Sequence, residues 1–116
     1  MTSKKEKTVL KLTLDKKPFQ VMVTGEKKEE FRKNKHWVTC RLIHGSTGQP
    51  KEHGFIKFTN GYGNDKPYFI CKYKGFSYVG SDYTPRKYSN GLVVSDVQEG
   101  HYIIHCGAIV ETGNLK

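Results

Sequence analysis

The alternation of apolar residues near the start of the chain restricts most strongly what it can fold into. In the segment TVLKLTL, Thr8 to Leu14, leucine occupies every second position. Successive side chains of a strand point to opposite faces, so this period of two predicts a half-buried β-strand. The leucines need a second layer to cover them, and a chain of 116 residues has room for one modest core. We therefore expect a single domain built around a sheet.

The remaining segments predict two helices followed by strands. Asp15 and Asn34 precede short apolar-periodic segments as candidate N-caps; the first helix would end at Gly25 and the second would run through Ile43. Strand patterns then recur, separated by turn-rich segments, at residues 55–59, 68–76, 92–95 and 101–111. In the last strand we expect one face to carry Tyr102, Ile104, Cys106, Ala108 and Val110.

This order of elements predicts an α+β fold. Two short helices near the N-terminus precede a curled sheet or small β-barrel. We expect the domain to span residues 8–116, after a flexible basic N-terminus at residues 1–7 that carries three lysines. The segment 80–91 has no periodicity and many turn formers, so we expect a mobile loop that could close over a ligand.

The charge of the chain points to a polyanionic partner. Twenty Lys and Arg residues against 11 Asp and Glu give a formal net charge of +9. On so small a surface this charge attracts nucleic acids and nucleotides. Part of it could equally serve solubility, as Lys-rich surfaces often do. RNA or a nucleotide is the partner class that we expect.

The cysteines, histidines and apolar runs predict a cytoplasmic protein without cofactor, metal or membrane partner. Three cysteines without close spacing indicate reduced thiols, and no apolar run is long enough to span a bilayer. His101 and His105 fall on a predicted strand, where they would lie about 13 Å apart and could not share one ion.

The segment TGEKKEEFRK, residues 24–33, carries seven charged residues in ten positions. As a helix it would gain little, because one i,i+4 ion pair contributes only about 0.3 kcal/mol. As a strand it would place Lys28, Glu30 and Arg32 on one face, and Lys27 on the other unless a bulge or turn intervenes. Such a strand is either a site with a carboxylate between cations or an exposed edge whose charges prevent aggregation.

The segment PFQVMVTGEKKEEFRKNKHWVTCRL resembles the signature of the ASCH domain, a PUA-like β-barrel module. In that signature a helix leads into a GxK segment and then into a strand ending in Arg, which here correspond to Gly25, Lys27 and Arg32. The chain is most similar to small stand-alone ASCH proteins of bacteriophages. Further similarity lies in FTNGYGNDKP, CKYKGF and YIIHCGAIVE, so the resemblance covers residues 8–111.

The resemblance implies a PUA-like barrel with a cleft beside the first helices, lined by Lys27 and Arg32 and suited to RNA or a nucleotide. Some ASCH proteins hydrolyse N4-acetylcytidine with Lys, Thr and Glu, and others are described as ribonucleases. Where the hydrolytic relatives carry the nucleophilic Thr, this chain has Glu30. Lys27 therefore matches the hydrolytic pattern, but the nucleophile does not.

We expect a module that binds RNA or a modified nucleoside or nucleotide. Cations would contact phosphate, Glu30 would contact a base edge or orient the cations, and Trp37 or Tyr62 would stack on a base. The binding residues that we expect are Lys27, Glu30, Arg32, Trp37, Arg41, Asn60, Tyr62, Lys72, Lys74, Arg86 and Lys87.

Two other functions stay open at this point. The chain could be a hydrolase of RNA or a modified nucleoside, with Glu30 as general base, Lys27 favouring the charged form of Glu30 and Arg32 stabilising a developing negative charge. Alternatively, a phage-encoded protein could use the same basic surface to sequester a host protein or a signalling nucleotide.

Overall fold

The structure is a computed structural model that describes residues 8–115. The basic N-terminus expected at residues 1–7 lies outside the described residues. The elements along the chain are β1 (Thr8–Leu14), α1 (Lys16–Val23), β2 (Glu29–Arg32), α2 (His36–Leu42), β3 (His53–Asn60), β4 (Tyr68–Tyr78), β5 (Arg86–Lys87), β6 (Val93–Val94) and β7 (Tyr102–Gly113). Neither helix is long and apolar enough to cross a membrane.

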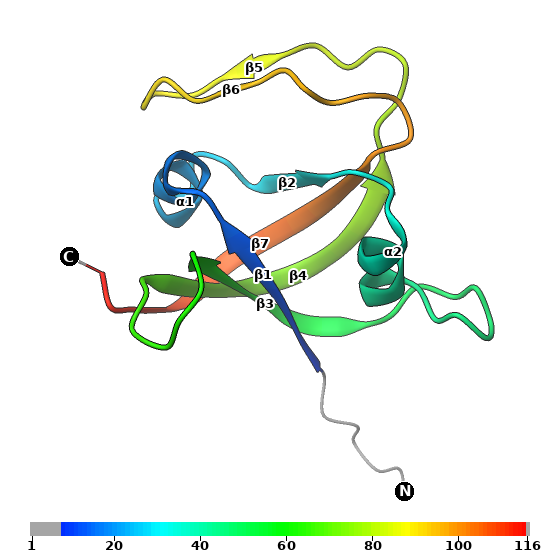
Figure 1. The fold of residues 1–116 in the computed structure, drawn as a ribbon, viewed down its shortest axis with the longest axis horizontal. Helices are drawn as coiled ribbons and strands as arrows, with labels where there is room; N and C mark the ends of the chain where they lie inside the picture. Colours follow the sequence, from blue (N-terminus) through cyan, green and yellow to red (C-terminus); the bar gives the residue numbers. More distant parts are fainter. Residues whose placement is uncertain (1–7, 116) are drawn as a thin grey trace, which may run out of the picture.

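One curled sheet organises the fold, in the strand order β1-β3-β4-β7-β2 (Figure 1). β1 pairs with β3 in parallel, and the other pairs of this sheet are antiparallel. The sheet forms a half-barrel, and its edge strands β1 and β2 are linked by a hydrogen bond from Arg32 Nη2 to the Thr13 carbonyl oxygen, 2.6 Å long. The prediction of an α+β fold with two short helices and a curled sheet is therefore confirmed.

The concave face of the sheet forms the core with both helices. The predicted alternation in β1 is confirmed, because its three leucines are buried while Val9 and Lys11 are exposed. β3, β4, β7 and the two helices contribute further buried apolar side chains: Phe19, Met22, Val38, Leu42, Ile56, Phe58, Phe69, Cys71, Tyr102 and Ile104.

The helix boundaries differ in part from those predicted. Asp15 is the N-cap of α1, although its side chain makes no capping hydrogen bond. Gly25 follows α1 with φ +87°, the left-handed conformation that glycine adopts without strain. The prediction that Asn34 caps α2 is wrong, since Lys35 is the N-cap. Asn34 Oδ1 instead accepts a hydrogen bond of 3.3 Å from Thr39 Oγ1 inside the helix.

The alternation predicted for β7 fails in its second half. Tyr102 and Ile104 are buried as expected, but Val110 is 51% exposed and Ile109 packs against the core instead. The register between β4 and β7 shifts several times in this region, so the side chains change face. Gly107 lies in this irregular part, directly against the side chains of Lys72 and Lys74.

The residues between β4 and β7, numbers 79–101, form an excursion that we call the strap (Figure 1). The prediction of a loop over residues 80–91 is wrong in part, because Arg86 and Lys87 form β5, which pairs with β6. Side chains attach the strap to the body: the Ser89 hydroxyl and backbone N–H donate to the Glu26 carboxylate, and Asn90 Nδ2 donates to the Lys17 carbonyl oxygen.

Phe58→Ala will destabilise the protein by about 3 to 5 kcal/mol, because it leaves a cavity beside Phe69, whose ring centroid lies 5.2 Å away. Phe55→Ala, on the same strand but on the partly exposed face, will cost roughly 1 kcal/mol. Urea unfolding followed by circular dichroism measures both. Equal costs would contradict the assignment of the core to the concave face.

Tyr73→Phe will make the protein less sensitive to alkaline pH. The Tyr73 hydroxyl is buried without a hydrogen-bond partner among residues 8–115, and burial raises its pKa to about 12. Between its unfolded value of about 10 and that pH, the unfolded state ionises while the folded state does not, so the free energy of unfolding falls. Urea unfolding at pH values from about 8 to about 12 measures this loss, and Tyr62→Phe, at an exposed tyrosine, serves as the control.

Candidate functional site

The charged segment at residues 24–33 forms a turn and a short strand. Only Glu29–Arg32 is β-strand, and it pairs with β7. Lys27 precedes the strand, and its backbone N–H donates to the Val21 carbonyl oxygen over 3.0 Å. The period of two therefore does not apply to Lys27. The turn that the sequence requires for Lys27 and Glu30 to share one side is therefore present, and their side chains form an ion pair.

Lys27, Glu30 and Arg32 form a buried charge network. The Lys27 Nζ lies 3.3 Å from Glu30 Oε1, and Arg32 Nε lies 2.8 Å from Glu30 Oε2. The Lys27 side chain is 2% exposed and that of Glu30 is 11% exposed. Lys27 Nζ also donates to the Glu29 carbonyl oxygen and lies 5.5 Å from the centroid of the Phe31 ring.

This network has a surplus of one positive charge at low exposure. Burying ions is costly, and pairing with good hydrogen bonds offsets that cost. Two cations around one carboxylate leave a net charge of +1. The Arg32 guanidinium uses Nε for Glu30 and Nη2 for Thr13. Its Nη1 makes no hydrogen bond to any residue of the described range, so it remains a donor for an anion or carbonyl group.

A cleft passes over the network and consists of three adjoining hollows. The first, about 320 Å³, and the second, about 360 Å³, share Pro18 and Glu30. The second also shares Thr13, Arg32 and Tyr62 with the third, which measures about 250 Å³. We call these hollows together the cleft, and the first of them the inner pocket.

The outer part of the cleft carries aromatic and guanidinium groups. Tyr62 is 84% exposed and Trp37 is 47% exposed. The Arg41 guanidinium lies 5.3 Å from the centre of the Trp37 ring, as the spacing of one helical turn predicts. Lys11 lines the same hollow. These groups combine flat π faces with positive charge, which suits a base and a phosphate.

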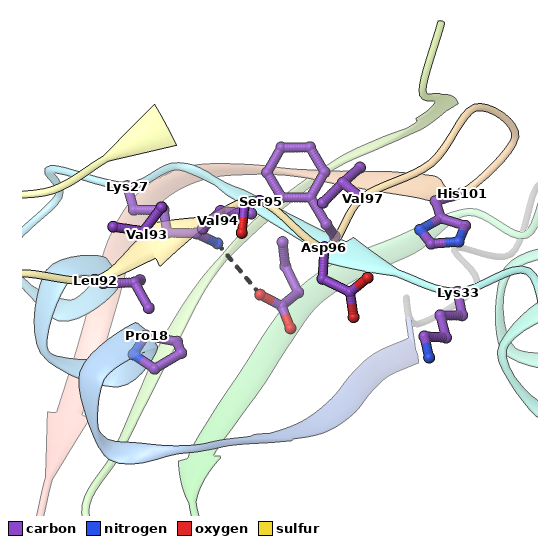
Figure 2. Close-up of a pocket in the computed structure, with 12 residues that line it drawn as sticks. Pro18, Lys27, Lys33, Leu92, Val93, Val94, Ser95, Asp96, Val97 and His101 are labelled. Carbon is purple, nitrogen blue, oxygen red and sulfur yellow. Dashed lines mark hydrogen bonds and ion pairs between the residues drawn. The ribbon is translucent and has the colours of Figure 1, made fainter. Parts of the chain in front are cut away.

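The inner pocket has apolar walls and polar groups at both ends, as Figure 2 shows. Pro18 lies opposite the strap residues Leu92 and Val93. The paired Lys27 and Glu30 line the same pocket. At the other end, polar side chains gather from three segments of the chain: Lys33, Asp96 and His101. The strap therefore forms one wall of the pocket, with residues 92–97 rather than the predicted 80–91.

Not all predicted site residues come together. The cleft gathers Lys27, Glu30, Arg32, Trp37, Arg41 and Tyr62. Asn60, Lys72, Lys74, Arg86 and Lys87 do not line it. Asn60 bonds to the Pro67 carbonyl oxygen through its backbone, and Lys72 lies on the exposed face of β4. Lys74, Arg86 and Lys87 line a separate hollow.

Other lining residues were missed by sequence reasoning. Lys33 ends the charged segment and His101 begins the last predicted strand, but neither pattern indicates a ligand there, and Asp96 lies in a segment without periodicity, so only the tertiary fold brings the three together. Pro18 was expected only as a first-turn residue of the helix, a role that gives no sign of a ligand. Among residues 8–115 there is no group of three or more His, Cys, Asp or Glu that could hold a metal ion.

Comparison with family models, with curated proteins and with solved structures finds no match to this chain.

Lys27→Met will destabilise the protein by about 3 to 5 kcal/mol, because it leaves the Glu30 carboxylate buried with one partner fewer. The same substitution at the exposed neighbour, Lys28→Met, will change stability by no more than about 0.5 kcal/mol. Denaturant unfolding measures both. Combining Lys27→Met with Glu30→Leu will cost less than the sum of the two single changes. Additive costs would show that the two side chains do not interact.

Proposed function

We propose that this protein is a single-domain binding module for RNA or a modified nucleoside or nucleotide, and that the cleft is its binding site. One observation carries the proposal: the buried Lys27–Glu30–Arg32 network lies directly under an open cleft that also exposes aromatic rings. A rigid positive group beside a flat apolar surface recognises the two parts of a nucleotide, which are phosphate and base.

Each part of the cleft suits a different part of such a ligand. Arg32 Nη1, Arg41 and Lys11 supply donors for phosphate in the outer part. Tyr62 and Trp37 offer faces on which bases stack. The inner pocket, about 320 Å³ with apolar walls, has the size of a small-ligand site and suits one base or nucleoside. At its end the paired Lys27 and Glu30, together with Arg32, leave a net positive charge beside that base.

We further propose that the chain is an ASCH domain and that its half-barrel is a PUA-like barrel. The convergence of Lys27 and Arg32 beside α1 supports this, because the GxK segment and the strand Arg are the residues on which the resemblance rests. The curled five-stranded sheet with two helices is compatible with the same proposal. Its test is a crystal structure with a bound nucleoside in the cleft.

Binding is favoured over hydrolysis by the state of Glu30. Both of its carboxylate oxygens already accept hydrogen bonds from cations, and the side chain is largely buried. A general base must accept a proton from water or a ribose hydroxyl within hydrogen-bond reach. Glu30 could do so only while competing with Lys27 and Arg32, so its role in this proposal is to hold the two cations in place.

Tyr62→Ala will weaken binding of a short oligoribonucleotide by about 1 to 3 kcal/mol, because it removes one stacking surface. Tyr78→Ala, at an exposed tyrosine outside the cleft, will leave the affinity unchanged. Fluorescence anisotropy at fixed salt measures both, with circular dichroism as a check of folding. Equal losses in the two variants would contradict the placement of the ligand in the cleft.

Incubation of the protein with RNA and with N4-acetylcytidine distinguishes binding from hydrolysis. We expect binding without product. Product that forms with the wild-type chain and disappears in a folded Glu30→Gln variant would overturn the binding-module proposal in favour of a hydrolase. Chromatography of the reaction mixture measures product, and thermal unfolding establishes that the variant is folded.

A further inference from the structure

A second hollow, about 690 Å³, lies on the other side of β2 from the cleft. Neighbouring residues of a strand point to opposite faces. Glu30 accordingly lines the cleft, while Glu29 lines this second hollow. The hollow is formed by the turn before β2, by β2 itself, by β4, by the strap and by β7. The charged or titratable residues that line it are Glu26, Lys28, Glu29, Lys74, Arg86, Lys87, Tyr88, His105 and Cys106.

Both acidic residues of this hollow already have partners. The Glu29 carboxylate forms an ion pair with Arg86, and its other oxygen lies 3.9 Å from His105 Nδ1. The Glu26 carboxylate accepts hydrogen bonds of 2.8 and 2.6 Å from the Ser89 backbone N–H and hydroxyl, which lower the pKa of Glu26. Glu29 is therefore neutralised by Arg86, whereas Glu26 keeps its negative charge, so the four Lys and Arg residues that line the hollow exceed its two carboxylates by two positive charges.

Three lysines remain around the hollow without such a partner. Lys28, Lys74 and Lys87 are exposed, and none of them forms an ion pair within residues 8–115. They come from three different segments, so the fold and not the sequence brings their charges together. Gly107 lets the stem of Lys74 lie against β7, since a Cβ at position 107 would lie 3.0 Å from Lys74 Cε.

The geometry points to a second anion site in this hollow, separate from the cleft, whose ligand is a phosphate group. Lysine ammonium groups are mobile point charges that bind phosphate without requiring one orientation. Such a group is present in free polyphosphate and in the backbone of a nucleic acid. Because β2 is an edge strand, a polynucleotide that filled both sites would pass around it. This path of a polynucleotide around β2 rests on the proposed function of the cleft, whereas the anion site itself does not.

Titration of the full chain with pyrophosphate tests the site. Amide resonances of residues 28, 74, 87 and 105 will shift in heteronuclear NMR spectra. The double variant Lys74→Ala/Lys87→Ala will bind about tenfold or more weakly, since each lost charge-assisted contact contributes more than a neutral hydrogen bond. A matched double variant, Lys35→Ala/Lys66→Ala, removes the same charge from exposed positions outside the hollow and will bind as the wild type does.

Two results would overturn the anion site. One is a set of shifts confined to cleft residues such as Arg32 and Arg41. The other is equal loss of affinity in both double variants, which would assign the binding to net charge alone. The same spectra establish that each variant is folded. Tyr62→Ala will leave pyrophosphate binding unchanged, so failure of the cleft proposal and failure of this one are distinguishable.

An oligoribonucleotide of about 12 nucleotides, within the usual site sizes for single strands, identifies the source of the phosphate. If the nucleic-acid backbone occupies the hollow, Lys74→Ala/Lys87→Ala will lower the slope of log K against log salt by about 2. The affinity for a nucleoside, which carries no phosphate group, will stay unchanged. An unaltered slope for the oligonucleotide would overturn the backbone as the source and assign the hollow to free polyphosphate.

Discussion

The position of the Glu30 carboxylate between two cations is the constraint on which the site depends. Lys27 and Arg32 each bind one of its oxygens, and Arg32 also donates to the Thr13 carbonyl oxygen on β1. One side chain thus connects the two edges of the curled sheet. A regular hydrogen-bonded ladder would close the gap between β1 and β2 completely. The guanidinium links the edges at one end and leaves the rest open as a cleft.

The same arrangement explains why a segment with poor strand propensity forms β2. Glu and Lys are disfavoured in strands because they gain little from packing on a pleated surface. Here each charged side chain of the strand has a partner: Glu29 binds Arg86 of the strap, and Glu30 binds Arg32 and the preceding Lys27. Phe31 packs its ring edge-on against Tyr83, with centroids 5.5 Å apart. Tertiary contacts therefore replace the propensity that the local sequence lacks.

Sequence reasoning succeeded where a short-range period determines the structure. The leucines of β1 and the Trp37–Arg41 pair on α2 follow from periods of two and of about four. It failed where tertiary contacts or a glycine break the period. The shifted register near Gly107 exposes Val110, whereas the turn at Gly25 is the break in the period that the sequence required for Lys27 to share a side with Glu30. Site residues in aperiodic segments, such as those of the strap, give no local signal at all.

The strap makes the two sides of β2 differ in chemistry. On one side its apolar residues, including Leu92 and Val93, cover the inner pocket and remove water from around Lys27 and Glu30, which strengthens the interactions of those charges with a ligand. On the other side Arg86 and Lys87 border a hollow that is open to solvent, where salt screens the charges. Binding in the inner pocket should therefore depend on shape and hydrogen bonding, and binding in the second hollow on ionic strength. A four-residue strand with adjacent glutamates thus separates the proposed binding cleft from the proposed anion site, and each glutamate lines one of them.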